Sequence, residues 1–344
     1  MKPEQVGGRG LVLGGGGLVG MGYHAGALKA LEEWGVDLGA SDVIVGTSAG
    51  AVMAAYVASG WTGDDFYEYA HGRHPTSEQD EASQKEQVRT IFTPLWQTPA
   101  ERVRRGIGST FAVVSSRGYW GRVTRGRLPA GALRKAFPAG LYSTEGTRFR
   151  LHDDLPEEWP RDHVYICVAD LYTGERVAFG APGAPEASLP EAVRASTSIP
   201  GVFPPVRIGE RHYVDGGVVS ATSLDLATGA GCRSIVCVAP LGYRKEEAAR
   251  STDPRLWSSM LVRSMFARSL RREVLAARAA GVDVLVIRPW LTDLRAHGTN
   301  SMRHFDRAAL ARSAREGTLR LLEENADHPA LAAASASPRR RARG

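Results

Sequence analysis

The residues best suited to chemistry gather around Ser48, at the centre of the pentapeptide Gly46-Thr47-Ser48-Ala49-Gly50. The apolar run Val43-Ile44-Val45 precedes it, and a stretch of small residues follows from Ala49 to Ala58. A serine at a sharp turn between a strand and a helix projects its hydroxyl outward, and flanking glycines relieve the crowding in the turn. This pattern predicts a nucleophile for acyl transfer. The alternative is a tight glycine turn in which Ser48 merely caps the helix.

A run of glycines, Gly14-Gly15-Gly16-Gly17, is the second candidate, and Gly20 follows it closely. Consecutive glycines let backbone N–H groups approach one atom, and two such donors stabilise a developing oxyanion by about 3 kcal/mol each. The spacing also fits a dinucleotide fingerprint, which requires an acidic residue at the end of the next strand. Glu32, Glu33 and Asp37 precede that strand instead of ending it, so we favour the oxyanion role.

Asp215 is the third candidate, because it leaves a short apolar strand and enters the double glycine Gly216-Gly217. An Asp-Gly pair on its own is typical of an ordinary turn. Asp215 therefore gains weight as a site residue only in combination with the Ser48 and glycine-run motifs.

Strands and helices alternate along most of the chain. Continuous apolar runs, such as Leu11-Val12-Leu13 and Val43-Ile44-Val45, are typical of parallel strands that helices cover on both faces. We therefore predict a three-layer α/β fold with a mostly parallel central sheet. Further strands are expected at 164–169, 176–179, 212–214, 235–239 and 282–287, and helices at about 256–280 and 305–325.

Changes in composition mark a helical, aromatic-rich insert at 61–150, which could form the wall or lid of a site. It lies within a first domain that is expected over 8–240. Helices and one strand within 241–330 are expected to pack on the same core. Residues 331–344, rich in Ala, Ser, Pro and Arg, are expected to form a disordered basic tail.

The composition is that of a globular protein, with 43% hydrophobic and 23% charged residues. Cys167, Cys232 and Cys237 are an odd number of cysteines in apolar surroundings, which indicates reduced thiols and a cytoplasmic location. No apolar run reaches the roughly 20 residues of a membrane span, and the first ten residues lack the pattern of a secretory signal. The cysteine spacing matches no zinc site, and the expected chemistry needs no metal or other cofactor.

The net charge of +6 is unevenly distributed. Basic clusters suit an anionic lipid surface or nucleic acid, and equally a solvated helix face. In one segment, apolar residues recur at helical spacing between arginines, which predicts either peripheral contact with a membrane or packing on the sheet, the commoner use. No nucleic-acid partner is expected. The apolar residues of this segment are Leu261, Val262, Met265, Phe266, Leu270 and Val274, and its arginines are Arg263, Arg268, Arg271, Arg272 and Arg278.

The three motifs, in this order and at this spacing, resemble the patatin-like phospholipase family. The resemblance includes residues 11–31 and 195–205 and covers about 10–239. It implies a hydrolase of lipid or other acyl esters with a catalytic dyad, in which Ser48 is the nucleophile and Asp215 the general base. It also implies an oxyanion hole. The amides of that hole belong to Gly15, Gly16 and Gly17, and the other motif glycines are Gly20, Gly46, Gly50, Gly216 and Gly217.

One position departs from the family pattern. The family usually carries Arg or Lys immediately before the last glycine of the loop, and this sequence has Val19. If that cation binds phosphate or another anion, its absence favours a neutral ester over a phospholipid.

Other functions remain open from the sequence. A Ser-Asp-His triad would need a histidine after the acid, and His297, His304 and His328 are available. A different class of protein would bind a nucleotide at the glycine run without catalysis, and another would bind lipid but be catalytically silent. His24, just after the glycine run, is expected on a helix surface or in packing.

Overall fold

The computed structural model divides into two compact units. Unit 1 combines Met1–Glu78 with Ala221–Gly344, and unit 2 is Gln79–Ser220. Unit 1 is therefore built from both ends of the chain, whereas unit 2 is continuous. The residues that the structure describes are 8–73, 93–116, 139–143, 155–243, 254–290, 293–294 and 306–331.

Unit 1 contains four parallel strands in the order β2-β1-β7-β8. Leu11 of β1 lies opposite Ile44 of β2 on one side and Val236 of β7 on the other. The strands β1, β2 and β7 are almost entirely buried, which explains their continuous apolar sequences. Their bounds are β1 Arg9–Leu13, β2 Val43–Thr47, β7 Ser234–Val238 and β8 Asp283–Ile287.

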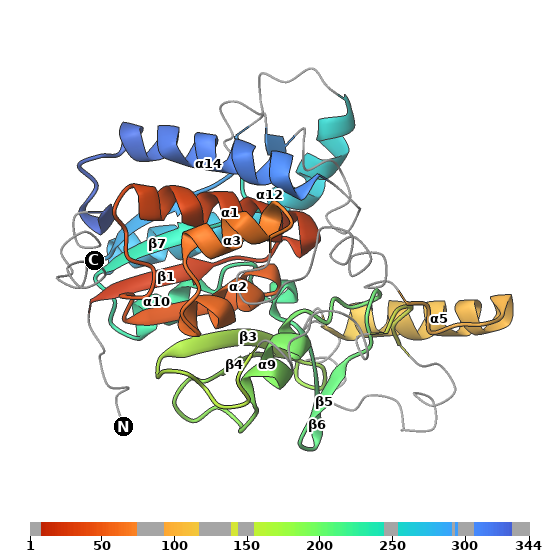
Figure 1. The fold of residues 1–344 in the computed structure, drawn as a ribbon. Coiled ribbons are helices and arrows are strands. Elements are labelled where there is room, and N and C mark those ends of the chain that lie inside the picture. Colours follow the sequence, from red (N-terminus) through yellow and green to blue (C-terminus); the bar gives the residue numbers. More distant parts are fainter. Residues whose placement is uncertain are drawn as a thin grey trace. The chain divides into compact units, whose positions relative to one another are not determined.

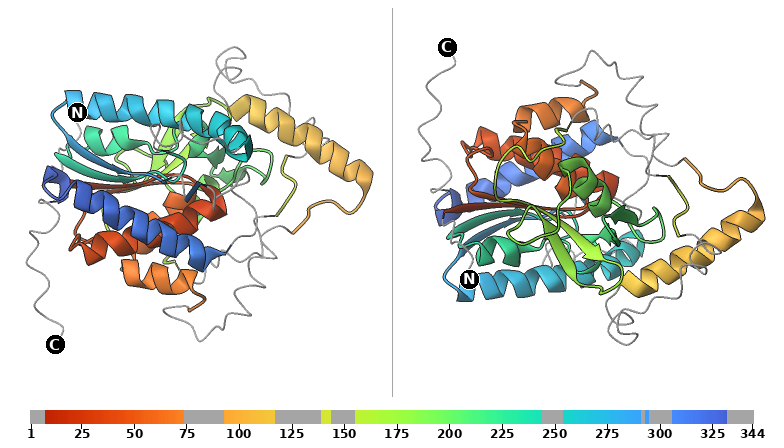
Figure 2. Two further views of the ribbon diagram at one scale, coloured as in Figure 1. Left: turned by 90° about the horizontal axis from the view of Figure 1, so that it is seen from above. Right: turned by 90° about the horizontal axis from the view of Figure 1, so that it is seen from below.

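Helices cover both faces of this parallel sheet. The helices α1, α3 and α14 lie on one face, and α10 and α12 lie on the other (Figures 1 and 2). A further helix, α2, follows β2 directly and contacts α1. The three layers of unit 1 confirm the predicted α/β class. The helices are α1 Gly17–Glu33, α2 Ala49–Ala58, α3 Gly63–Ala70, α10 Leu224–Gly229, α12 Pro254–Ala279 and α14 Arg307–Glu324.

The contact between α1 and α14 depends on Gly26. A Cβ atom at this position would lie 2.1 Å from the carbonyl oxygen of Ala311 and 2.8 Å from the amide nitrogen of Arg315. No side chain fits at such distances, so glycine lets the two helix backbones come into direct contact. The Trp290 indole, three residues after β8, donates to the carbonyl of Gly317 in α14 at 2.7 Å.

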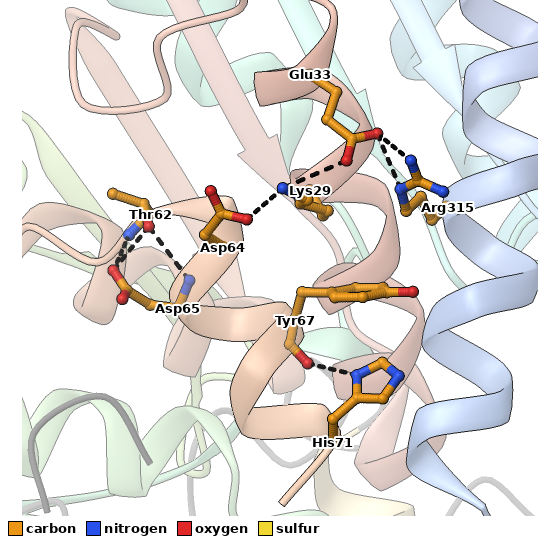
Figure 3. A network of polar contacts seen from close by, with 8 residues as sticks. All are labelled: Lys29, Glu33, Thr62, Asp64, Asp65, Tyr67, His71 and Arg315. Carbon is orange, nitrogen blue, oxygen red and sulfur yellow. Dashed lines mark hydrogen bonds and ion pairs between the residues drawn. The ribbon is translucent and has the colours of Figure 1, made fainter. Parts of the chain in front are cut away.

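Polar side chains join the outer surfaces of α1, α3 and α14 (Figure 3). Lys29 of α1 contacts Glu33 at 3.3 Å and also pairs with Asp64 of α3. Glu33 in turn accepts from Arg315 of α14 at 2.7 Å. Since several of these groups are solvent-exposed, the network adds little stability compared with the packing at Gly26.

Unit 2 contains four antiparallel strands in the order β5-β6-β3-β4. Short connections join β3 to β4 and β5 to β6, and such hairpins require antiparallel pairing. The parallel arrangement that the sequence predicts therefore holds in unit 1 but not for these strands. The elements are α5 Pro99–Ser116, β3 Val164–Asp170, β4 Arg176–Phe179, α9 Leu189–Ser196, β5 Val206–Ile208, β6 Arg211–Asp215 and the 3-10 helix η1 Gly216–Val218.

The expected strands and helices agree well with the observed ones, but α9, α10 and β5 have no counterpart among them. The short strand β5 is not evident from the sequence, because Arg207 at its centre is exposed and only two apolar residues flank it. The insert at 61–150 contains α3 and α5, but 74–92, 117–138 and 144–150 lie outside the described residues, as does the tail from 332. No helix in the described part is both long and apolar enough to cross a membrane.

Candidate active site

Ser48 occupies a strained turn between β2 and α2. Its backbone has φ 56° and ψ −122°, and its side chain is buried. A positive φ at a residue other than glycine costs about 1–3 kcal/mol and persists only where the surrounding structure enforces it. Ser48 stands at the N-cap position of α2, yet its hydroxyl makes no capping hydrogen bond. Thr62 and Ser188 do cap their helices, so the capping interpretation does not explain Ser48.

The two glycines of the pentapeptide are required by close packing. A Cβ atom on Gly50 would lie 1.9 Å from the carbonyl oxygen of Leu13, and one on Gly46 would lie 2.6 Å from that of Gly50. The first contact presses the start of α2 against the end of β1, where the glycine run begins. The turn at Ser48 and the glycine run are therefore brought together inside unit 1.

The glycine run lies directly beside Ser48. A Cβ atom on Gly15 would be 3.3 Å from the Cβ of Ser48. The Gly14 amide donates to the carbonyl of Val238, and the Gly15 amide donates to that of Ala221, both at 2.8 Å. These two bonds fix the path of the loop on leaving β1.

Gly16 and Gly17 provide the amides best placed to stabilise an oxyanion. Gly16 is the N-cap of α1 and Gly17 its first residue, where helix amides have no intrahelical acceptor. Within the described residues, the structure gives acceptors for the amides of Gly14 and Gly15 but none for those of Gly16 and Gly17. The start of a helix also favours negative charge. A Cβ atom on Gly16 would lie 2.6 Å from the Cα of Gly20, so both glycines are needed for this geometry.

His24 holds the same loop from inside the core. It is fully buried, and its Nε2 lies 2.7 Å from the carbonyl oxygen of Gly14. Burial lowers the pKa of His24 to about 4, although the hydrogen bond to Gly14 opposes this shift. The ring is therefore neutral at pH 7, and Nε2 carries the proton that it donates to Gly14. Its Nδ1 has no hydrogen-bond partner among the described residues.

Glu273 of α12 anchors the segment that receives the Gly15 amide. Its carboxylate accepts from the Thr222 hydroxyl at 2.8 Å and from the Leu224 amide at 3.0 Å. Leu224 is the first residue of α10, so Glu273 caps that helix from another element. The adjacent Ala221 carbonyl is thereby fixed where Gly15 donates to it.

Arg263 places a buried positive charge behind the glycine loop. Its Nη1 donates to the carbonyl of Pro240 at 2.7 Å and to that of Gly242 at 3.3 Å. A Cβ atom on Gly16 would lie 3.0 Å from Pro240, so this segment contacts the loop. Burial lowers the pKa of Arg263 to about 10, which leaves it charged at neutral pH. The sequence groups Arg263 with surface arginines, whereas the structure buries it.

Asp215 ends β6 in unit 2 and is buried. Its Oδ1 accepts from the Gly217 amide at 2.7 Å, and its own amide donates to the carbonyl of Ser198 at 3.0 Å. A Cβ atom on Gly216 would lie 2.5 Å from the carbonyl oxygen of Cys167 in β3. The double glycine thus has a packing role, and the carboxylate is held in one orientation.

The comparison with known families addresses the nature of this site. Residues 11–228 match a family model described as patatin-like phospholipase. The chain belongs to the patatin-like phospholipase family. The match spans β1 to α10 and so contains Ser48, the glycine run and Asp215. Family membership is therefore carried by the segments that hold all three motifs.

Individual relatives are more distant. An uncharacterised NTE-family protein of Mycobacterium tuberculosis is 27% identical over 233 residues, which is 67% of this chain and 30% of that protein. The uncharacterised protein YqhO of Bacillus subtilis is 31% identical over 222 residues, covering 61% of this chain and 63% of YqhO. The chain thus spans about a third of the length of the mycobacterial relative. The crystal structure of VipD from Legionella pneumophila shares 17% identity, with a TM-score of 0.41 and coverage of 94% and 67% of the two chains.

Several residues near the patatin-like glycine loop prove to be core. Val19, at the position where the family usually has a cation, is buried, as are Leu18 and Tyr23. Met21 is half-buried. These side chains therefore pack mainly in the interior of unit 1.

The dinucleotide alternative finds no support at the expected acidic residues. Glu33 pairs with Lys29 and Arg315, and Asp37 accepts from the amide of Ala40. None of them lies at the end of β2, the position at which such a site binds ribose.

His328 is too far from Ser48 to complete a triad. It bonds to the backbone of Val284, at the start of β8. Across the sheet Val284 aligns with Val43, at the start of β2, through Ile235 and Gly10. Ser48 follows the other end of β2, five residues on, which is roughly 16 Å at about 3.3 Å per residue. His297 and His304 lie outside the described residues.

The predicted site residues fall into two groups. Ser48 and the glycine run lie together in unit 1, and Asp215 lies in unit 2. The dyad of Ser48 and Asp215 therefore stays a prediction. Sequence reasoning missed His24, Glu273 and Arg263 as supports of the loop. Only His24 carries a local signal, because a helical residue one turn after Gly20 points back toward the start of its helix.

Proposed function

We propose that the protein hydrolyses carboxylic esters of lipids, with Ser48 as nucleophile and Asp215 as general base. The observation that carries this proposal is the strained, non-capping Ser48 next to a loop whose helix-start amides lack acceptors. Membership of the patatin-like phospholipase family supports the same reaction class.

The proposed reaction has two steps. Ser48 Oγ attacks the ester carbonyl carbon while Asp215 takes its proton, and the amides of Gly16 and Gly17 stabilise the negative oxygen. The proton then passes to the departing alcohol, leaving an acyl-serine. A water molecule, deprotonated by the same carboxylate, attacks the acyl group and releases a fatty acid and free Ser48. The Gly15 amide supports this loop through its bond to Ala221 instead of facing the oxyanion.

Esters are the natural substrates for this arrangement. A carboxylate is a weaker base than imidazole at neutral pH, so the mechanism favours leaving groups that depart more easily than amines. Val19 contributes no charge to the loop, and we propose neutral esters ahead of phospholipids as substrates. The buried cation at Arg263 is engaged by two carbonyls.

We also propose that the enzyme works in a reducing compartment, the cytoplasm. Its cysteines Cys167, Cys232 and Cys237 are buried and free. Burial raises the pKa of Cys232 to about 12, so this thiol is protonated and unreactive at pH 7.

The decisive experiment replaces Ser48 by Ala and Asp215 by Asn in separate proteins. Each change is expected to lower kcat/KM on p-nitrophenyl esters by at least about a thousandfold, because each removes one group of the reacting pair. The matched controls are Ser59→Ala, at the end of α2, and Asp225→Asn, which is exposed. Both controls should keep full activity.

A fluorophosphonate probe supplies an independent readout. It should label the wild type and the two controls but not the Ser48→Ala protein. Triacylglycerol and phospholipid, tested next, rank the neutral and charged substrates. Full esterase activity after either substitution would refute the dyad, and labelling of Ser48 without activity on any ester would refute the hydrolase.

A further inference from the structure

Among the described side chains of helix α5 in unit 2, the two large apolar ones face solvent. Val103 is 64% exposed and Ile107 52% exposed, the former being the most exposed large hydrophobic residue among those described. They are four residues apart and so lie on one face of the helix, one turn from each other. Exposed apolar side chains that adjoin in this way mark a binding surface more often than isolated ones do.

The opposite face of α5 is the one that packs on unit 2, and it is polar. Arg105 donates to the carbonyl of Gly140, and the buried Ser109 accepts from the Gly140 amide at 2.9 Å. Each follows Val103 or Ile107 by two residues, which is about 200° around a helix. An ordinary surface helix turns its apolar stripe inward. In α5 the arrangement is reversed, because Val103 and Ile107 face solvent while Arg105 and Ser109 contact unit 2.

The charges beside this face are positive. Arg102 and Arg104 are exposed, and the guanidinium of Arg102 lies 5.1 Å from the centre of the Trp96 ring. The acidic residue of the first turn, Glu101, accepts from the amides of Gln97 and Thr98 at the start of the helix. Exposed apolar residues flanked by arginines and a tryptophan are typical of helices that lie at a lipid surface.

The α12 segment, which the sequence suggests for this role, differs in its packing. Leu270 is buried and Phe266 half-buried, so its apolar stripe packs within unit 1. Its exposed hydrophobics, Met265 and Leu275, stand ten residues apart, about 15 Å along the axis, and do not adjoin. Since Arg268 and Arg272 are also exposed, the described side chains of α12 offer charge without a contiguous apolar face.

We propose that α5 is an interfacial helix that docks the protein on anionic lipid surfaces. Val103 and Ile107 enter the boundary between head groups and acyl chains, while Arg102 and Arg104 pair with lipid phosphates. The occupant is a bilayer and not a second protein chain, because positive charge flanks the apolar residues on the described face. Docking requires no hydrolysis, so it stands or falls separately from the esterase proposal.

The test measures binding to vesicles with the Ser48→Ala protein, in which the lipid stays intact. Vesicles of phosphatidylcholine mixed equally with phosphatidylglycerol should sediment the protein, and those of phosphatidylcholine alone should bind it less. Val103→Asp and Ile107→Asp should each weaken partitioning by about tenfold, since each removes a buried aliphatic side chain from the interface. The matched control is the α12 pair Met265→Asp and Leu275→Asp, which should bind as before.

Substitutions of arginine measure the electrostatic contribution to vesicle binding. Arg102→Gln and Arg104→Gln should each reduce binding to the mixed vesicles by roughly fivefold, and added salt should abolish the difference. Arg268→Gln and Arg272→Gln on α12 provide the control at equal loss of charge. Activity of all these variants, made with Ser48 intact, on a short soluble ester verifies that each protein is folded.

A probe of depth completes the design. A dye sensitive to polarity, attached to Ile107→Cys, should shift its emission to the blue on mixed vesicles, whereas the same dye on Met265→Cys should not. Because the native cysteines are buried, labelling is selective. Equal losses from α5 and α12 substitutions, or a concentration-dependent dimer that Ile107→Asp dissolves without any vesicle binding, would overturn the proposal.

Discussion

Side chains outside the three motifs determine where the glycine loop lies. The His24 ring donates to the Gly14 carbonyl. Glu273 binds Thr222 and so fixes the neighbouring Ala221 carbonyl, which accepts from the Gly15 amide. As a result, the Gly14 carbonyl and the Gly15 amide are both engaged in hydrogen bonds within the protein. The amides of Gly16 and Gly17 then remain at the start of α1 without an acceptor among the described residues.

Replacement of His24 tests this positioning role. His24→Leu removes the donor to Gly14 and leaves a buried carbonyl unsatisfied, which costs about 1–3 kcal/mol of stability. We expect kcat on a soluble ester to fall about tenfold or more, because small displacements of positioning groups strongly slow the chemical step. KM should change little. His24→Gln keeps a nitrogen donor in place and should recover most of kcat, whereas a purely space-filling role predicts that Leu is the better substitute.

The low pKa of His24 also predicts how stability depends on pH. The unfolded chain takes up a proton at about pH 6.5, whereas the folded protein does so only near pH 4. Between these values the unfolded state binds more protons, so stability falls as pH falls, by about 3 kcal/mol in all for this residue. Denaturant unfolding of His24→Gln, measured over this range, should show a shallower decline than the wild type. Parallel declines would contradict the assignment.

The three site motifs are readable from sequence because each is local. Ser48 and its glycines, the glycine run and the Asp215 turn depend on a few consecutive residues between a strand and a helix. Glu273 and Arg263 are not readable, since their partners lie about 20 to 50 residues away and the contacts exist only once α12 has packed. The same holds for the engagement of the Gly15 amide by Ala221.

Among the elements, the pairing of α1 with α14 shows which interaction dominates. Gly26 allows the two backbones to touch, while Arg315 and Glu33 form a partly exposed ion pair beside them. Exposed pairs of this kind contribute about 0–1 kcal/mol, whereas a forced overlap in a packed region costs about 1–3 kcal/mol or more. Packing rather than charge therefore holds α14 in place.

Gly26→Ala should consequently lower the free energy of unfolding by at least about 2 kcal/mol, because its Cβ would overlap the Ala311 carbonyl. Arg315→Ala should lower it by less than about 1 kcal/mol. Gly106→Ala is the matched control in another helix, since nothing lies within 4 Å of its added Cβ. That variant should be neutral or stabilised by up to about 1 kcal/mol. A larger loss in Arg315→Ala than in Gly26→Ala, measured by chemical denaturation, would reverse the ranking.

Helices and strands with strong apolar periodicity follow the sequence to within a few residues, as the ends of α12 and α14 show. The exceptions arise where tertiary contacts outweigh local pattern. The strand β5 forms through its pairing with β6, and α5 exposes the face that periodicity alone would have placed in a core.

At the scale of the whole molecule, the family match ends before the fold is complete. It stops at residue 228, yet β7, β8, α12 and α14 of unit 1 all come later. The strand β7 pairs with β1 along its whole length, so the motif-bearing region does not contain its own sheet. The catalytic domain expected at 8–240 includes β7, and α14 belongs to the segment 241–330 that is expected to pack on the same core.

A fragment of residues 1–228 should therefore fail to fold. Without β7 and α14, the fragment would expose one edge of β1 and one side of α1. Apolar residues of both elements are buried in the intact chain. We expect insoluble expression, or a circular dichroism spectrum without a cooperative thermal transition, and no esterase activity. The intact Ser48→Ala protein is the control, because it lacks activity but should melt cooperatively. A soluble, active fragment would show that the late elements are accessory.

Because unit 1 combines segments from both ends of the chain, it can be completed only late in synthesis. A ribosome makes α1 some 270 residues before α14, a delay of roughly 14 to 55 s at 5–20 residues per second. Throughout that interval the face of α1 that packs on α14 is uncovered, and β1 lacks its partner β7 until Ser234–Val238 has been made. The contacts of Glu273 with Thr222 and Leu224 likewise form only after α12 has been made, so the glycine loop of a half-made chain lacks part of the support that it has in the folded protein.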